Sequence, residues 1–190
     1  MSAEARIARI ERAAAERAPR VVDVLVYAAI IALGAMQYLL AQRSPDFYTG
    51  DTTYFELARS LVSRGVYGFN FQPETVLPPG FPVIMAGLCV SVGCGYTVFV
   101  HAVIVFSTLG WLASYELLRR MEGRAVAAAV CLLLISSPLE FALATRIVFS
   151  DLPYVFTSML VLLLVRRLDA ECTTDDLNAE GAVDDPQLAA

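Results

Sequence analysis

The sequence predicts an all-α integral membrane protein with about four transmembrane helices and a structured first external loop that contains amphipathic helices. Of its 190 residues, 57% are hydrophobic and only 17% are charged, and the mean hydropathy is +0.61. The apolar residues also form blocks of membrane-spanning length, separated by joints that contain arginine. A soluble domain needs more charged surface, whereas this block pattern is typical of membrane spans.

The N-terminal residues 1–22 predict a cytoplasmic amphipathic helix, because arginines are spread around an alanine-rich segment with few large apolar residues. The first span covers about residues 24–41, and only Gln37 interrupts its apolar run. A cleaved signal peptide is the alternative, but its apolar region usually has about 7–15 residues. The longer run favours an uncleaved anchor.

Three further spans are predicted at about residues 98–118, 125–144 and 150–165, so that residues 23–168 form one transmembrane region. Arginines precede the first span and follow the second and fourth. The positive-inside rule therefore predicts a cytoplasmic N-terminus in an inner or plasma membrane. The fourth apolar block is short, so a re-entrant segment is its alternative. No span shows a central charge or an unwound Gly/Pro pair of the kind that lines a transport pathway.

This topology places residues 42–97 outside the cytoplasm. Within this loop, apolar residues recur at helical spacing and predict an amphipathic helix on the membrane surface; they are Tyr54, Phe55, Ala58, Leu61 and Val62. Paired prolines then precede the apolar segment 81–92, which is too short to cross a bilayer. We expect this segment to pack back against the spans.

The last residues, 169–190, predict a disordered acidic tail. Seven of the 19 acidic residues lie there, without any basic residue. The chain also lacks a basic patch interleaved with aromatic residues, so nucleic-acid binding has no support. The four cysteines lack the spacing of metal ligands. Cys131 is interpreted as a core residue, whereas Cys89 and Cys94 are candidates for a disulfide on the outer side.

Two acidic residues in the predicted outer loops are candidates for chemistry. Asp51 precedes the amphipathic helix and could cap it, but Thr53 and Glu56 have capping-box spacing and could cap the helix instead. Asp151 follows Arg146 in the second outer loop, where a helix cap or a local ion pair is the simpler interpretation. The functional interpretation is that the two acids share one external cleft.

A third acid, Glu140, follows Pro138 near the outer end of the third span. It could face the same cleft, or its side chain could extend to the membrane interface. The sequence leaves both alternatives open.

The segment Gly50–Tyr67, followed by Leu77–Pro82, resembles the first external loop of the GT-C superfamily of glycosyltransferases. The most similar branches are the protein O-mannosyltransferases, the aminoarabinose transferases and the rhizobial lipopolysaccharide glycosyltransferases. Residues 146–153 are similar to their second external loop, which also carries an acid. The resemblance covers roughly residues 24–165 and depends on the order of these features.

The resemblance implies an inverting transferase of the cell envelope, which moves a hexosyl or pentosyl group from a polyprenyl-phosphate donor to a lipid, glycan or protein acceptor. Asp51 would act as the general base, and Asp151 would bind a divalent metal ion or position substrate. Arg64 and Arg146 would stabilise the departing phosphate. Glu74 lies near the place where some relatives have an acid before paired prolines, although here it is displaced from the prolines.

The chain departs from this family in its length, because the relatives usually continue through several more spans. We therefore expect the N-terminal portion of a transferase, which missing segments or a partner subunit would complete. The alternative is a non-catalytic membrane subunit that uses the external loop to dock a partner.

Overall fold

The computed structural model describes residues 3–43, 52–69, 72–74, 76–148 and 150–183, with only the backbone described for residues 3–19, 52, 69 and 170–183. These residues form seven α-helices and one short antiparallel hairpin. The helices are α1 (Ala3–Leu39), α2 (Thr52–Arg64), α3 (Gly80–Ser91), α4 (Tyr96–Met121), α5 (Arg124–Ile135), α6 (Pro138–Arg146) and α7 (Asp151–Val183). In the hairpin, β1 (Gly68–Phe69) pairs with β2 (Gln72–Pro73). The all-α prediction is confirmed for this part of the chain.

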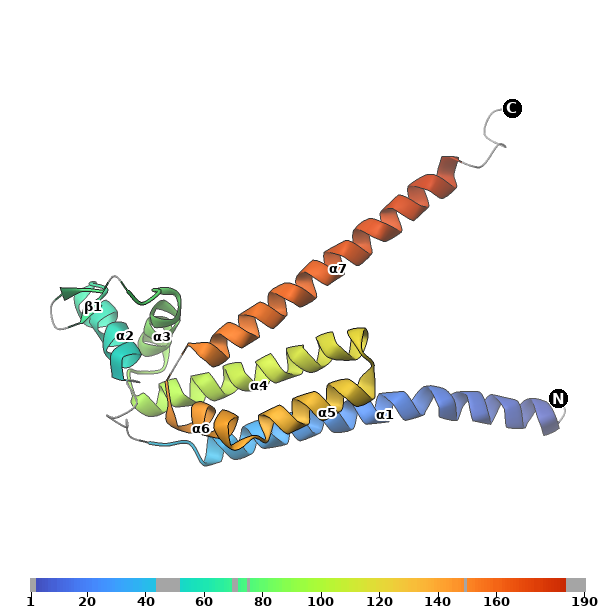
Figure 1. Ribbon diagram of the computed structural model, residues 1–190, viewed down its shortest axis with the longest axis horizontal. Helices are drawn as coiled ribbons and strands as arrows, with labels where there is room; N and C mark the ends of the chain where they lie inside the picture. The colour runs from blue at the N-terminus through green and yellow to red at the C-terminus, as the bar shows by residue number, and fades with distance from the viewer. Residues whose placement is uncertain (1–2, 44–51, 70–71, 75, 149, 184–190) are drawn as a thin grey trace.

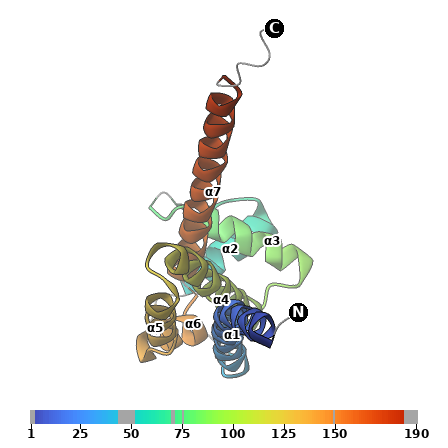
Figure 2. The same cartoon turned by 90° about the vertical axis from the view of Figure 1, so that its right-hand side faces the viewer.

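Helices α1, α4 and α5 lie side by side, and α7 packs on α4 before it diverges from the bundle (Figures 1 and 2). Helices α2, α3 and α6 and the start of α7 gather at one end, which we call the loop end (Figure 1). The connection between α4 and α5, residues 122–123, lies at the opposite end, which we call the turn end (Figure 1). The two predicted outer loops therefore lie at the same end of the molecule.

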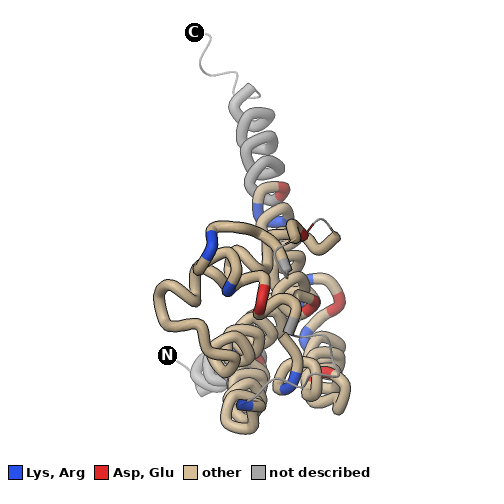
Figure 3. The backbone as a smooth tube through the Cα atoms, turned by 90° about the vertical axis from the view of Figure 1, so that its left-hand side faces the viewer, with Lys and Arg blue, Asp and Glu red and all other residues tan. Residues whose placement is uncertain are grey.

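Two helical segments are long and apolar enough to cross a membrane, Arg20–Leu39 in α1 and Tyr96–Met121 in α4. Together, α5 and α6 form a bent third candidate, and most of the described chain carries no charged residue (Figure 3). These segments indicate a multi-pass membrane protein. The predicted fourth span lies in α7 and is not among them, because Arg166 and Arg167 follow a short apolar stretch.

The predicted third span is broken at Ser136 and Ser137, where α5 and α6 meet at 57°. Ser137 caps α6, because its Oγ accepts a hydrogen bond from the backbone N–H of Glu140 at 3.2 Å. Pro138 cannot donate a backbone hydrogen bond and is well suited to the first position of a new helix. The sequence therefore ends α5 and starts α6 within one apolar block.

Two helices extend beyond the predicted boundaries. The expected cytoplasmic helix and first span form the single helix α1, and α7 continues to Val183 through most of the tail predicted to be disordered. Alanine, leucine and glutamate favour helix in this tail, and the next proline is Pro186. Local helix propensity thus extends a helix that the apolar segment has already started.

The loop end has its own core, in which α2, α3, α4 and α6 meet. Leu57 and Ala58 of α2 are buried, and Phe81 and Met85 of α3 pack toward Phe99 of α4. The predicted amphipathic helix is confirmed over α2, and the apolar segment of α3 packs against the bundle as expected. Burial of these side chains fixes both helices of the external loop on the end of the spans.

The turn end is held by a network of ion pairs and tyrosine hydroxyls. Tyr115 donates to Asp23 at 2.7 Å, and the Nε of Arg124 lies 3.1 Å from the same carboxylate. Arg119 pairs with both Asp23 and Glu116, and Tyr27 donates to Glu116 at 2.7 Å. The network links α1, α4 and the start of α5.

Candidate functional site

Helix α2 meets the residue before α7 at the loop end through a polar contact. The hydroxyl oxygen of Tyr54 lies 3.3 Å from Ser150 Oγ, and Asp151 is the next residue. The Tyr54 ring also packs edge-on against Phe81 of α3, with ring centroids 5.4 Å apart. The apolar stripe of α2 therefore places its first turn beside the second outer loop.

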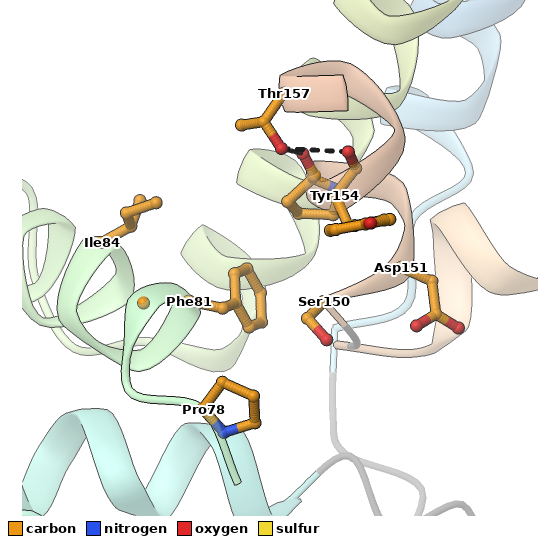
Figure 4. A pocket seen from close by; sticks show the side chains of 9 residues that line it. Pro78, Phe81, Ile84, Ser150, Asp151, Tyr154 and Thr157 are labelled. Carbon is orange, nitrogen blue, oxygen red and sulfur yellow. Dashed lines mark hydrogen bonds between the residues drawn. The ribbon is translucent and has the colours of Figure 1, made fainter. Parts of the chain in front are cut away.

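A cleft of about 350 Å³ opens between α3 and α7 (Figure 4). Phe81 and Ile84 line the α3 side, whereas Ser150 and Asp151 lie on the α7 side. Thr157 also lines it, but its hydroxyl donates to backbone carbonyls of its own helix. The remaining lining residues are Pro78, Gly80, Pro153 and Tyr154. The cleft is mainly apolar with a polar margin, which suits an amphiphilic ligand.

Of the two predicted acids, Asp151 lies among the described residues and Asp51 does not. Asp151 is exposed, is the first residue of α7 and lines the cleft. Its charge there also interacts favourably with the helix dipole, so a capping contribution is compatible with its position. Asp51 lies outside the described residues and directly precedes α2.

Glu74 has a local contact that accounts for its position. Its Oε1 accepts hydrogen bonds from the backbone N–H groups of Val76 at 2.6 Å and Leu77 at 3.2 Å. Tyr67 donates to the Leu77 carbonyl at 2.9 Å, and its pKa is raised by burial and then by the charge of Glu74. The carboxylate thus orders the turn that leads to the paired prolines.

The two predicted phosphate contacts lie at helix ends. Arg64 ends α2 and Arg146 ends α6, and both are exposed. The backbone carbonyl of Arg146 accepts a hydrogen bond from Tyr96 at 3.0 Å, which fixes the end of α6 on α4. Among the described residues Arg146 has no ion pair with Asp151, so the predicted local pair is not formed.

The described residues contain no group of three or more histidine, cysteine or acidic side chains that could hold a metal ion. Asp151 therefore belongs to no such group in that part of the chain. Its metal role stays a prediction.

A buried polar cluster was missed by the sequence interpretation. Glu140 is only 7% exposed, and its carboxylate accepts hydrogen bonds from Gln37 at 2.7 Å, Ser107 at 2.5 Å and Trp111 at 3.2 Å. Glu140 thus neither lines the cleft nor extends to the membrane interface, because α6 turns its side chain inward after the break at Ser137. The sequence signals were two polar residues within apolar blocks, Gln37 in the first span and Glu140 in the third.

Comparison with known proteins gives no relative. No known protein family, curated protein or solved structure matches this chain. The resemblance to GT-C glycosyltransferases therefore depends on the loop residues alone.

Proposed function

We propose that this chain belongs to a membrane glycosyltransferase that transfers a sugar from a polyprenyl-phosphate donor to an acceptor outside the cytoplasm. One observation carries the proposal, the contact between Tyr54 and Ser150. Asp51 is three residues before Tyr54, and Asp151 directly follows Ser150. We take both acids to act beside this contact, since each is within three sequence positions of one of its two residues. Acids at opposite ends of the bundle could not share one site.

The proposed chemistry divides the roles among these residues. Asp51 removes the proton from the acceptor hydroxyl while the acceptor oxygen attacks the anomeric carbon. The bond between that carbon and the phosphate oxygen breaks with inversion, and the polyprenyl phosphate leaves with the bonding electron pair. Asp151 positions substrate or a divalent ion at the margin of the cleft. The apolar wall from Phe81 to Ile84 suits a lipid-linked ligand.

The proposal is tested by transfer activity. Membranes that contain the full chain, with any partner that co-purifies, are supplied with undecaprenyl-phosphate-linked hexoses and pentoses. We expect labelled sugar to pass to a lipid, glycan or protein acceptor at a rate above that of membranes without the chain. The absence of transfer with every donor would contradict the proposal and favour the docking subunit.

Arg146 provides a test of the phosphate contact. We expect Arg146→Ala to lower kcat/KM for the donor by roughly 10-fold to 100-fold, because a charge-assisted hydrogen bond contributes about 1.5–3 kcal/mol. Arg146→Lys should keep part of this rate, since it retains the charge but loses the planar fork. Arg120→Ala, at the turn end, is the control and should leave kcat/KM unchanged. An equal loss in both alanine variants would contradict a phosphate role.

We also propose the predicted orientation, with the N-terminus in the cytoplasm and α7 as the fourth span. The supporting observation is the disulfide between Cys89 and Cys94, which joins the last turn of α3 to the segment before α4 at the loop end. Structural disulfides persist mainly outside the reducing cytoplasm. Both predicted outer loops would then face the oxidising side.

Cysteine labelling tests this orientation. In a chain with Cys131→Ala and Cys172→Ala, a membrane-impermeant maleimide should label the exposed Cys94 in intact cells only after treatment with a thiol reductant. A control chain that also carries Cys89→Ser and Cys94→Ser, with Glu122→Cys at the turn end, should be labelled only after the membrane is opened. The reverse pattern would invert the topology.

A further inference from the structure

Glu140 lies deep in the bundle, away from the cleft. Its partners Ser107 and Trp111 lie near the middle of the candidate span Tyr96–Met121. Its third partner, Gln37, comes from the other long candidate span. Three helices, α1, α4 and α6, thus contribute side chains to one buried polar cluster.

The charge of this cluster is not balanced by protein groups. All three donors to Glu140 are neutral, namely an amide, a hydroxyl and an indole N–H. No arginine or histidine in the described part of the chain forms an ion pair with it. An ionised carboxylate at membrane depth is costly unless a counter-charge accompanies it. The neutral donors orient the carboxylate but add no positive charge.

Gln37 supplies an independent indication of a missing ligand. Its side chain is 1% exposed, and its Oε1 is the buried side-chain atom without a hydrogen-bond partner among the described residues. The amide nitrogen of the same planar group donates to Glu140, so the oxygen belongs to the same polar cluster. Buried amide oxygens are normally satisfied, because an unpaired one costs about 1–3 kcal/mol.

We propose that Glu140 and Gln37 bind a monovalent alkali-metal cation between α1, α4 and α6. The carboxylate supplies the counter-charge, and Gln37 Oε1 supplies a neutral oxygen ligand that otherwise has no partner. Ser107 Oγ donates to Glu140 and keeps lone pairs that could complete the oxygen set. Hard cations prefer such oxygen ligands.

The single carboxylate favours a monovalent ion over a divalent one. Divalent ions in proteins usually take several carboxylates or keep much of their water. In the described chain the hydrogen-bond partners of Glu140 are all neutral, and it belongs to no group of three or more acidic, histidine or cysteine side chains. One negative charge and one positive charge give a neutral cluster. Neutrality lowers the cost of burying the site at membrane depth.

The proposal is tested by cation-dependent stability and direct binding. The full chain in nanodiscs is unfolded thermally in NaCl or KCl, with N-methylglucamine chloride keeping the ionic strength constant. A cation that binds only the folded chain should raise Tm progressively once its concentration exceeds Kd, by roughly 5–10 °C at about 100 times Kd. Binding of ²²Na⁺ and its displacement by unlabelled Na⁺ or K⁺ is measured on the same samples.

Glu140→Gln is the decisive variant. The new side chain keeps a carbonyl oxygen that accepts hydrogen bonds from Ser107 and Trp111. When the Gln37 amide group rotates so that its Oε1 faces position 140, the new amide nitrogen can donate a hydrogen bond to that oxygen. We therefore expect a folded chain whose Tm no longer responds to Na⁺ or K⁺ and which binds no ²²Na⁺. Gln37→Leu should weaken ²²Na⁺ binding by about 10-fold or more, since about 1.4 kcal/mol corresponds to one decade. Glu122→Gln, at the turn end, should respond like the unaltered chain.

Three outcomes would overturn the proposal. One is a wild-type Tm that is equal in alkali-metal and N-methylglucamine chloride. Another is a cation response that persists in Glu140→Gln. The third is a Tm that changes with pH but not with either cation, since the cluster would then hold a proton. If Glu140→Gln does not fold, the binding loss in Gln37→Leu decides the question.

Discussion

Replacing Asp51 with asparagine is expected to lower the rate of sugar transfer by roughly 10²–10⁴-fold, the usual contribution of a general base. Asparagine has nearly the same shape as aspartate but cannot accept the proton of the acceptor hydroxyl at neutral pH. The measurement is single-turnover transfer in membranes saturated with donor, so that binding and chemistry are separated. The amount of folded chain should not change.

The matched comparisons are Asp151→Asn and Glu122→Gln. Asp151 lines the cleft, and its loss should raise the KM for substrate as well as lower kcat if it positions substrate or a metal ion. Glu122 is an exposed acid at the turn end, and its substitution should leave both constants unchanged. If Asp51→Asn keeps full transfer while Asp51→Ala only disrupts assembly, the chain is a docking subunit.

The helices and the loop end could be predicted from sequence because hydropathy and helical period act locally. The two long spans follow from uninterrupted apolar runs, and α2 follows from the spacing of Tyr54, Phe55 and Ala58. Arg119 and Arg120, in the last turn of α4, indicated the turn end correctly as a joint between helices. Each of these signals is contained within one segment of the chain.

The break in the third span had a local signal that the hydropathy obscured. Ser137 and Glu140 have capping-box spacing, with Pro138 at the first helical position, which indicates a helix start. Only one of the two capping-box hydrogen bonds forms: the Ser137 hydroxyl accepts a hydrogen bond from the Glu140 backbone N–H. The Glu140 side chain instead accepts hydrogen bonds from Gln37, Ser107 and Trp111.

The role of Glu140 could not be predicted from spacing, because it depends on which groups the fold brings near. Glu74, in contrast, accepts hydrogen bonds from backbone groups two and three positions ahead, which is a local turn contact. Glu140 meets Gln37 across 103 positions of sequence. Non-local partners of this kind are set by helix packing, which a single sequence does not specify.

Replacing Asp23 with alanine should lower the free energy of unfolding by about 2–3 kcal/mol, which is below the 3–5 kcal/mol of a fully buried pair because Arg124 is half exposed. Asp23 is the acceptor that joins α1 to Tyr115 of α4 and to Arg124 of α5. Its loss leaves the hydroxyl of the buried Tyr115 ring without this acceptor. In nanodiscs, Tm should fall by roughly 4–12 °C.

A double-mutant cycle separates the hydroxyl from the ion pair. Arg119 keeps its pair with Glu116 after the change, and Arg124 can turn toward water, so the unsatisfied Tyr115 hydroxyl should carry much of the loss. Adding Tyr115→Phe to Asp23→Ala should then restore part of the Tm, with a coupling of about 1 kcal/mol. Glu122→Ala, an exposed acid at the same end, should change stability by less than about 0.5 kcal/mol. If the losses in the free energy of unfolding for Asp23→Ala and Tyr115→Phe were additive, the hydrogen bond between them would contribute nothing. The network would then stabilise the helix bundle through its ion pairs alone.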